Sequence, residues 1–344
     1  MEVRCVGNCR FEDPQSILKV VLHYSTWALA SGTHDRMLTP PPLKHGDLIR
    51  VVAPSSRFDR TRFDAGIACL KERGFRVAFR DDIYANSRYL AGDDERRASE
   101  LREALADDEA QAVWCARGGY GAQRLFPLLE TFELSTPKWL VGFSDITALH
   151  GWVRRRGYQS LHGPNVTTLP QWSSEAVDET FELLTDSKWR GWTLQGASEG
   201  VDAVEGRLIG GNLTVLASLM GSEEQPFFKN ELLCIEDVGE RPYRLDRSFE
   251  QLRQAGVLDG VAGVILGNFQ SCDETRDEVT LLSGLDILEE RFRNEGVPVF
   301  KDAPFGHHNE SRAFRHGELV RLVHDGSGVY RATPKKFLLP GVHT

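Results

Sequence analysis

The sequence predicts an α/β protein with a parallel sheet in an N-terminal domain and a smaller, mixed α/β domain after it. Segments with strand character alternate with segments of helical spacing from Leu48 to Asp186. Beyond Asp186 this alternation loosens into a mixture of strands, helices and a hairpin. The chain has 344 residues, more than one small core usually takes, so two domains are expected.

The first domain is expected to span residues 37–186. Its strands are predicted at 48–55, 75–80, 111–117, 138–143 and 160–164. Helices are predicted between and after them, at 61–74, 93–107, 122–130, 145–157 and 174–186. This alternation is typical of a parallel sheet covered on both faces, in which active sites lie at the carboxyl ends of the strands.

A linker is predicted at 187–203, where Trp, Gly and Ser are frequent, and the second domain at 204–344. In that domain strands are expected at 205–211, 231–237, 261–269 and 298–306, and helices at 212–221, 244–256 and 284–296. A closing hairpin over 318–333 turns at Asp325 to Gly328.

Composition and charge exclude several classes of function. Apolar residues make up 41% and charged residues 26%, and the formal net charge is −9. The one short basic run, Arg154 to Arg156, is no footprint for nucleic acid or a membrane surface, and no apolar run reaches the ~18 residues of a membrane span. None of the six cysteines is in C-x-x-C spacing, so buried free thiols in a reducing, cytoplasmic compartment are expected.

The first 36 residues fit the rest of the chain poorly. Their mildly apolar centre and the Ala28-x-Ala30 pattern raise a signal peptide as an interpretation, but Lys19 and His23 interrupt the apolar region and no basic segment precedes it. A disordered extension, or upstream sequence before a true start at Met37, is the favoured interpretation.

Ser144 lies where a predicted strand meets a predicted helix, in "GFSDITALH". A serine on such a corner has an exposed hydroxyl, and the next amides and the helix N-terminus favour an oxyanion there. Ile146 occupies the place of the second glycine of G-x-S-x-G. The local pattern alone favours the alternative, in which Ser144 or Asp145 caps the helix.

Three further segments contain candidate site residues. In "ARGGYGAQR", Gly118 and Gly119 allow backbone amides to approach an oxyanion or a phosphate, although a tight strand-to-helix loop explains them equally well. Glu236 ends the apolar strand "LLCIED", as a site carboxylate or as a solvated strand end. His307 follows Gly306 in a loop and is either a general base or a surface histidine, and no partner at zinc-ligand spacing accompanies it apart from His308.

Taken together, Ser144, Glu236 and His307 each lie at the carboxyl end of a predicted strand, which favours a shared cleft between the two domains. The chain here resembles the LD-carboxypeptidases, serine peptidases that include muramoyl-tetrapeptide carboxypeptidase. The matching stretches are "VVAPSS", "ARGGYGAQRL", "GFSDITALH", "SLHGPNV", "GGNLTVLASLMG", "IEDVGERPYRLDRSFEQLRQAG", "GVILGNF" and "APFGHHN".

The resemblance implies a class I amidotransferase-like first domain and a Ser144–His307–Glu236 triad without metal or cofactor. It implies cleavage of the bond to the terminal D-alanine of peptidoglycan tetrapeptides during cell-wall recycling, and a homodimer. The amide of Asp145 and one from Gly118 or Gly119 would hold the oxyanion, and Arg117 is a candidate for the terminal carboxylate of the substrate. Phe314 to Gly317 replaces a Leu-Pro-x-Gly pattern found in many members, which affects the expected cleft wall.

Two alternatives stay open at this stage. The first is a microcin C self-immunity type of peptidase, which uses the same triad on an amide that joins an acyl group to a nucleotide. The second is a non-catalytic module whose glycine loop and cleft bind a small anionic ligand.

Overall fold

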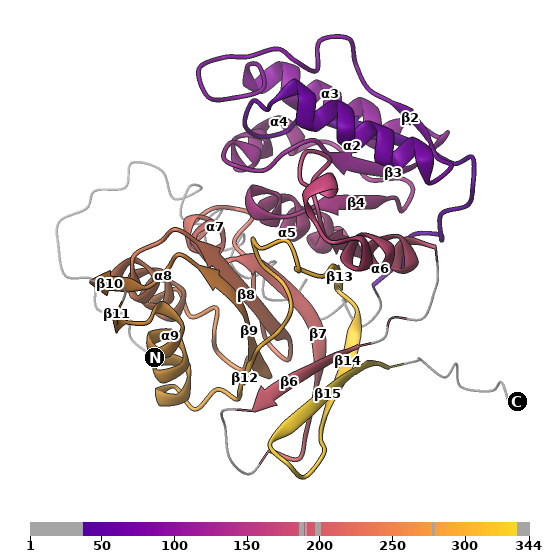
Figure 1. Cartoon of the computed structure of the whole chain (residues 1–344). Helices are drawn as coiled ribbons and strands as arrows, with labels where there is room; N and C mark the ends of the chain where they lie inside the picture. Colours follow the sequence, from indigo (N-terminus) through magenta and orange to yellow (C-terminus); the bar gives the residue numbers. More distant parts are fainter. Residues whose placement is uncertain (1–36, 186–188, 190, 197–200, 277–278, 336–344) are drawn as a thin grey trace, which may run out of the picture. The chain divides into compact units, whose positions relative to one another are not determined.

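A parallel sheet organises the first part of the chain. The computed structural model describes residues 37–185, 189, 191–196, 201–276 and 279–335. The expectations for residues 1–36 lie outside this range. The described residues from Leu38 onward form one compact unit (Figure 1).

The sheet has six strands in the order β13-β5-β4-β3-β1-β2. Five of them are parallel, as predicted, and β13 pairs antiparallel with β5 at the edge. The strands are β1 (Leu48–Val52), β2 (Arg76–Ala78), β3 (Ala110–Cys115), β4 (Trp139–Gly142), β5 (Ser160–His162) and β13 (Phe314–His316).

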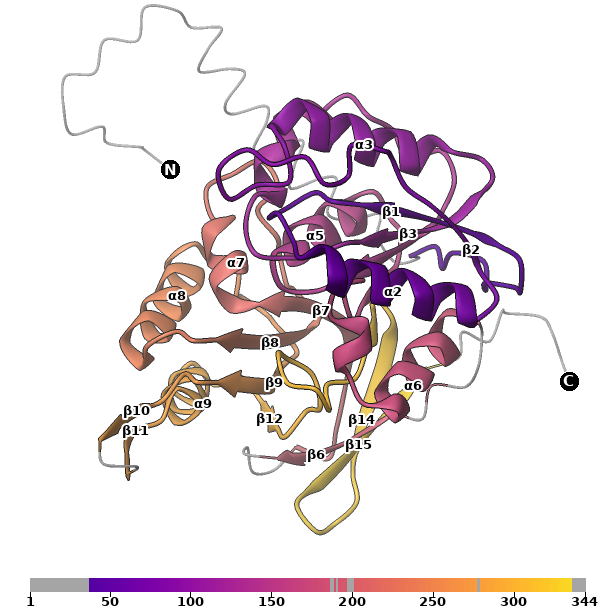
Figure 2. The ribbon, with the colours of Figure 1, turned by 45° about the horizontal axis from the view of Figure 1, so that its top comes forward.

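Helices cover both faces of this sheet (Figure 2). The strand side chains alternate between the two faces. Ile49 and Val51 face the side of α2 and α6, whereas Val52 faces the side of α3 and α5. The helices are α2 (Arg60–Glu72), α3 (Asp94–Ala106), α4 (Phe126–Leu129), α5 (Thr147–Arg155) and α6 (Ser174–Leu184), with 3-10 turns η1 (Ala122–Leu125), η2 (Ser144–Ile146) and η3 (Leu169–Gln171).

The second part of the chain is a closed barrel, in the order β12-β6-β15-β14-β7-β8-β9. Its strands are β6 (Trp192–Gly196), β7 (Ala203–Asn212), β8 (Leu232–Val238), β9 (Gly263–Gln270), β12 (Val299–Lys301), β14 (Leu319–His324) and β15 (Val329–Pro334). Strand β6 lies inside the predicted linker 187–203, and the boundaries proposed for the domains stay a prediction. The predicted mixture of strands and helices is confirmed.

Three helices pack on the outside of the barrel: α7 (Leu213–Ser218), α8 (Pro242–Gln254) and α9 (Gly284–Asn294). A separate pair of strands, β10 (Glu274–Arg276) and β11 (Val279–Leu282), lies beside them. Inward residues such as Cys234 and Ile265 belong to the same buried cluster as Trp114 and Val141 of the first sheet, so one core runs from the sheet into the barrel.

Strand β13 joins the two parts. It contains Phe314 and His316, from the segment that departs from the Leu-Pro-x-Gly pattern, and both side chains are buried. The amide of Gly210 in β7 donates a hydrogen bond to His316 Nε2 at 3.1 Å. This segment therefore closes the edge of the first sheet and contacts the barrel.

Two helical glycines offer a matched test of the packing. A Cβ at Gly66 in α2 would lie 2.0 Å from the carbonyl oxygen of Val166, whereas a Cβ at Gly151 in α5 would have no neighbour within 4 Å. Gly151→Ala should stabilise the fold by up to ~1 kcal/mol through helix propensity, and Gly66→Ala should destabilise it by about 1–3 kcal/mol through overpacking. Denaturant unfolding of both variants measures this, and equal stabilisation by the two would contradict the packing described for α2.

Candidate active site

Ser144 stands on a strained corner between β4 and α5. Strand β4 ends at Gly142, and Ser144 opens the turn η2 with a φ of +66°, a left-handed conformation that costs of order 1 kcal/mol or more for a residue with a side chain. Neither η2 nor α5 has a side-chain cap. The helix-cap alternative for Ser144 is therefore wrong. The strained backbone of Ser144 indicates that its conformation serves something other than capping.

Asp145 does not cap the helix either. Its buried carboxylate accepts a hydrogen bond from the amide of Ala122 at 2.8 Å, just after the glycine loop. Burial raises the pKa of this carboxyl above its ordinary value. Because Asp145 lies in the first turn of η2, its own N–H has no partner within that turn and is left for another acceptor.

Glu236 and His307 lie in direct contact. His307 Nδ1 and Glu236 Oε2 are 2.6 Å apart, and Glu236 at the carboxyl end of β8 is fully buried. Burial lowers the pKa of His307, but the charge of Glu236 and the hydrogen bond to it outweigh burial, so the pKa is raised above its ordinary value. The buried carboxylate thus fixes the ring and favours its charged form.

Phe143 connects this pair to the serine corner. Its ring lies 4.8 Å from the His307 ring, centroid to centroid, and it directly precedes Ser144. Among the hydrogen bonds of the described residues, none joins Ser144 to His307. The structure therefore leaves the assignment of a triad as a prediction.

The glycine loop, residues 118–121, packs closely against Ser144. A Cβ at Gly118 would lie 2.8 Å from Ser144 Cβ and 3.1 Å from Ser144 Oγ, so only glycine fits there. Gly119 has a φ of +101° and lies against Ser56 in the same way. The structure brings these residues together, whereas the exposed Arg117 donates a hydrogen bond to the carbonyl of Arg57 at 2.6 Å.

Asn212 is a site residue that the sequence analysis missed. Its Nδ2 donates to Asp237 Oδ1 at 3.0 Å and to Glu236 Oε1 at 3.4 Å, and its Oδ1 accepts from the amide of Val215 as the cap of α7. Its backbone N–H donates to Thr147 Oγ1 at 3.0 Å. An asparagine before a helical run signals a cap, but nothing local reveals that it also supports the acid.

His150 also lies behind the nucleophile corner. Its Nε2 is 2.9 Å from the carbonyl oxygen of Gly142, and its Nδ1 is 2.8 Å from Ser160 Oγ. A carbonyl oxygen only accepts, so Nε2 carries the proton and Nδ1 accepts from the serine. Burial lowers the pKa of His150 to about 4, so the neutral ring fixes the end of β4.

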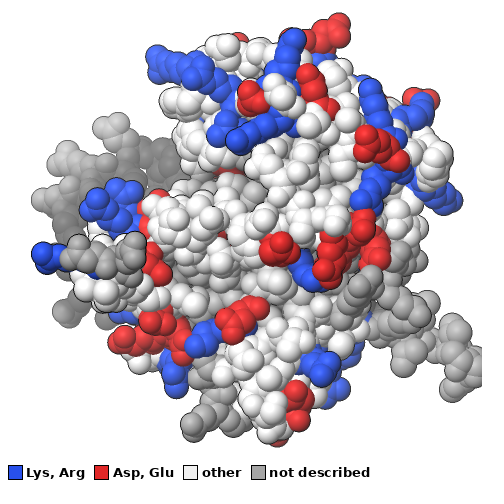
Figure 3. Space-filling model, in the orientation of Figure 1, with Lys and Arg blue, Asp and Glu red and all other residues white. Residues whose placement is uncertain are grey.

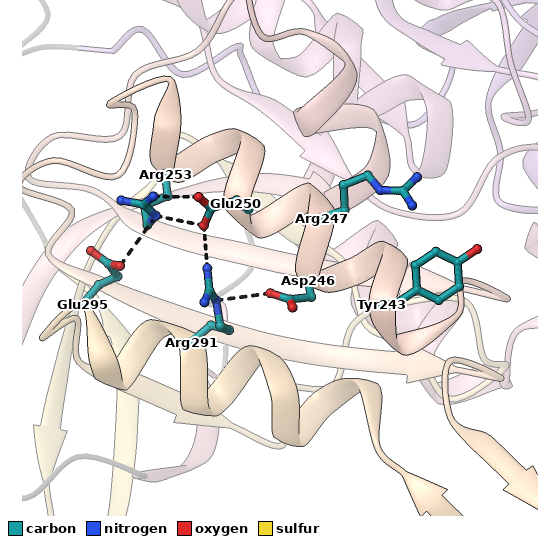
Figure 4. Close-up of a pocket in the computed structure, with 7 residues that line it drawn as sticks. All are labelled: Tyr243, Asp246, Arg247, Glu250, Arg253, Arg291 and Glu295. Atoms are coloured by element: carbon teal, nitrogen blue, oxygen red, sulfur yellow. Dashed lines mark hydrogen bonds and ion pairs between the residues drawn. The ribbon is translucent and has the colours of Figure 1, made fainter.

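The charged hollow between α8 and α9 is a different feature, with a volume of about 590 Å³ (Figure 4). Arg291 bridges Asp246 and Glu250, and Arg253 bridges Glu250 and Glu295. The ion pairs of Arg291 with Asp246 and Glu250 link α9 to α8. The hollow contains none of the predicted catalytic residues.

Charges of both signs are interspersed over the face of the molecule drawn in Figure 3. In the described part of the chain, no group of three or more His, Cys, Asp or Glu residues is arranged to hold a metal ion. None of the described helices is long and apolar enough to cross a bilayer. Cys115, Cys234 and Cys272 are buried free thiols, as predicted, and Cys69 is half-buried.

A strained serine corner on a parallel α/β sheet, with a carboxylate–histidine pair nearby, defines a serine-hydrolase type of architecture. Comparison with known proteins makes the class specific. Residues 49–163 match the LD-carboxypeptidase N-terminal domain, and residues 205–322 match the LD-carboxypeptidase C-terminal domain. The chain belongs to the LD-carboxypeptidase family and is a serine-type carboxypeptidase, a hydrolase, as the resemblance predicted.

Curated relatives are named as carboxypeptidases. The chain is 38% identical over 274 residues to a putative carboxypeptidase of Synechocystis, covering 78% of this chain and 89% of the relative. It is 33% identical over 289 residues to the murein tetrapeptide carboxypeptidase of Pseudomonas aeruginosa, covering 80% and 92%.

Solved structures share the fold. The muramoyltetrapeptide carboxypeptidase of Oxalobacter formigenes superposes with a TM-score of 0.71 at 26% identity, covering 85% of this chain and all of that one. The microcin C7 self-immunity protein superposes with a TM-score of 0.74 at 22% identity over 88% of this chain and all of that one, which shows the fold alone.

The Glu236–His307 contact makes a direct electrostatic prediction. Replacing Glu236 by Gln removes the charge that raises the pKa of His307 and leaves the burial that lowers it, so the pKa should fall. An NMR titration of the His307 ring measures this without any substrate. Glu205→Gln is the control, because Glu205 pairs with Arg321 and Lys335, and a His307 pKa unchanged in Glu236→Gln would contradict the contact.

Proposed function

We propose that this carboxypeptidase hydrolyses the bond to the terminal D-alanine of peptidoglycan tetrapeptides through Ser144, His307 and Glu236. The observation that carries the proposal is the 2.6 Å contact between His307 Nδ1 and buried Glu236, beside a serine held at positive φ. The murein tetrapeptide carboxypeptidase among the relatives supports the substrate class. Cytoplasmic cell-wall recycling and a homodimer belong to the same proposal, and the buried free thiols fit a reducing compartment.

In the first step Ser144 Oγ attacks the scissile carbonyl carbon. His307 takes the hydroxyl proton on Nε2, because Nδ1 is engaged by Glu236. The negative charge that forms on the carbonyl oxygen is held by the N–H of Asp145 and by an amide of the glycine loop. Glu236 stabilises the resulting imidazolium, in line with the raised pKa of His307.

In the second step the tetrahedral intermediate collapses and the C–N bond breaks. His307 gives its proton to the amine of D-alanine, which leaves, and an acyl ester remains on Ser144. Water then attacks that ester with His307 again as base, the shortened peptide is released as the acid, and the serine hydroxyl is regenerated by a proton from His307. His307 has to approach Ser144 when substrate is bound, since apo sites often hold these groups apart. Arg117 remains the candidate for the free carboxylate of the substrate.

Removal of the nucleophile tests the route. Ser144→Ala should lower kcat by about 10³- to 10⁶-fold, because no acyl ester can form. Ser271→Ala is a matched control, since Ser271 is a serine at positive φ (57°) outside the site and should keep wild-type activity. Release of D-alanine from an L,D-tetrapeptide is the assay, and near-normal turnover by Ser144→Ala would end the proposal.

The substrate class has its own test. The purified enzyme should cleave the tetrapeptide with a kcat/KM at least roughly 100-fold above that for an aspartyl sulfamoyl adenosine or for the same peptide ending in L-alanine. We expect the tetrapeptide to be the better substrate because the chain is 33% identical to a murein tetrapeptide carboxypeptidase. Its similarity to the microcin C7 self-immunity protein, at 22% identity, concerns the fold alone. A higher kcat/KM for the acyl sulfamoyl nucleoside would instead assign the self-immunity type of substrate.

A further inference from the structure

Arg97 is a buried charge that the catalytic proposal does not use. It lies on α3, its side chain has no exposed surface, and its partners are backbone carbonyls and one carboxylate. One guanidinium nitrogen, Nη1, donates to the carbonyl of Pro54 and to that of Gly121, the latter at 2.8 Å. The other, Nη2, binds Asp94. A buried arginine is costly unless such partners hold it, so its position calls for an explanation.

The bonds of Arg97 converge on one end of the glycine loop. The peptide between Gly121 and Ala122 is held on both sides, by Arg97 at the carbonyl and by Asp145 at the amide, 2.8 Å in each case. Gly121 has a φ of +128°, and a Cβ there would lie 2.8 Å from Arg97 Nη1. The guanidinium therefore occupies the space that the missing side chain leaves.

The other end of the loop is tied to the segment after β1. The amide of Tyr120 donates to Ser56 Oγ at 3.1 Å, and the carbonyl of Gly118 accepts from the amide of Ser56 at 3.3 Å. Within the described residues, the N–H groups of Gly118 and Gly119 have no acceptor. The loop is thus fixed by its other groups, while the amide of Gly118, which lies against Ser144, and the amide of the next residue, Gly119, stay available.

We infer that Arg97 is a positioning residue that holds the glycine loop so that an amide of Gly118 or Gly119 faces the oxyanion formed at Ser144. The inference rests on the proposed function for its chemistry. Arg97 touches neither the nucleophile nor the substrate in this scheme and acts through the Gly121 carbonyl. The planar fork of arginine reaches both carbonyls and Asp94 at once, which a lysine ammonium does not.

The first test compares two arginines of one helix. Arg97→Lys should lower kcat on the tetrapeptide by roughly 10- to 100-fold with KM within about twofold, because oxyanion contacts form only in the transition state. Arg102→Lys is the control: Arg102 is on α3 but binds Leu128 and Glu95, and kcat should stay within about twofold of wild type. A folded Arg97→Lys enzyme with wild-type kcat, or one that changes KM alone, overturns the inference.

A milder pair covers the case in which Arg97→Lys does not fold. Asp94→Asn weakens the anchor of Arg97 at a part-exposed side chain, but Asp94 also pairs with Arg124 of η1. Arg124→Gln, which loses only that second ion pair, is therefore the control. Hydrogen exchange of peptides spanning 117–122 should quicken more in Asp94→Asn than in Arg124→Gln, and equal exchange in the two variants overturns the inference.

The exchange measurement needs no turnover, so it separates the two proposals. If the wild-type enzyme does not release D-alanine, the proposed function is wrong. The exchange rates still show in that case whether Arg97 holds the loop. A wild-type enzyme that does cleave, together with an inert Arg97→Lys substitution in the folded protein, sinks the positioning role alone.

Discussion

The hydroxyl of Thr147 accepts a hydrogen bond from the backbone amide of Asn212, and the active site depends on this joint between sheet and barrel. Ser144 comes from the first sheet, whereas Glu236 and His307 come from the barrel, so a shift of one part against the other would separate them. A Cβ at Gly211 would lie 2.4 Å from Thr147 Oγ1, which leaves no room for a side chain between the two corners. The close approach of the β7 backbone to the Thr147 side chain therefore sets the geometry of the chemistry.

Buried charge is the second constraint on the site. Glu236 and Asp237 are adjacent on β8 and both almost fully buried, which is unfavourable unless each has partners. Glu236 has His307 and Asn212, while Asp237 accepts from the amide and hydroxyl of Thr214. Burial first, and then the charge of Glu236, raise the pKa of Asp237.

Much of this arrangement could be predicted from the sequence, because the relevant signals are local. Ser144 lies just after β4, Glu236 lies near the carboxyl end of β8, and His307 lies in the loop after β12. The parallel sheet follows from the alternation of strands and helices. The supporting residues could not be predicted. The contacts of Arg97 and Asn212 join segments far apart in the chain, and a helical arginine or a capping asparagine looks ordinary by itself.

The closed barrel was also beyond prediction, for a similar reason. Strand β6 has five residues in a segment whose composition resembles a linker, and it becomes a strand by pairing with β12 and β15. Ser144 is a case in which the local sequence pattern by itself favours the wrong role. Local statistics favour a capping serine, but the φ of +66° and the absence of a capping bond are properties of the folded chain.

The edge strand β13 has a consequence for how the protein is made. Phe314 to His316 complete a sheet whose other five strands all lie before residue 163, and the same segment bonds to β7. During synthesis, the five parallel strands leave the ribosome first, with β5 as an open edge. This edge is covered only after β13 has been synthesised, when most of the remaining chain is complete. Maturation of the site is therefore linked to completion of translation, and a chain that ends early keeps the serine corner but lacks both the sheet edge and the histidine.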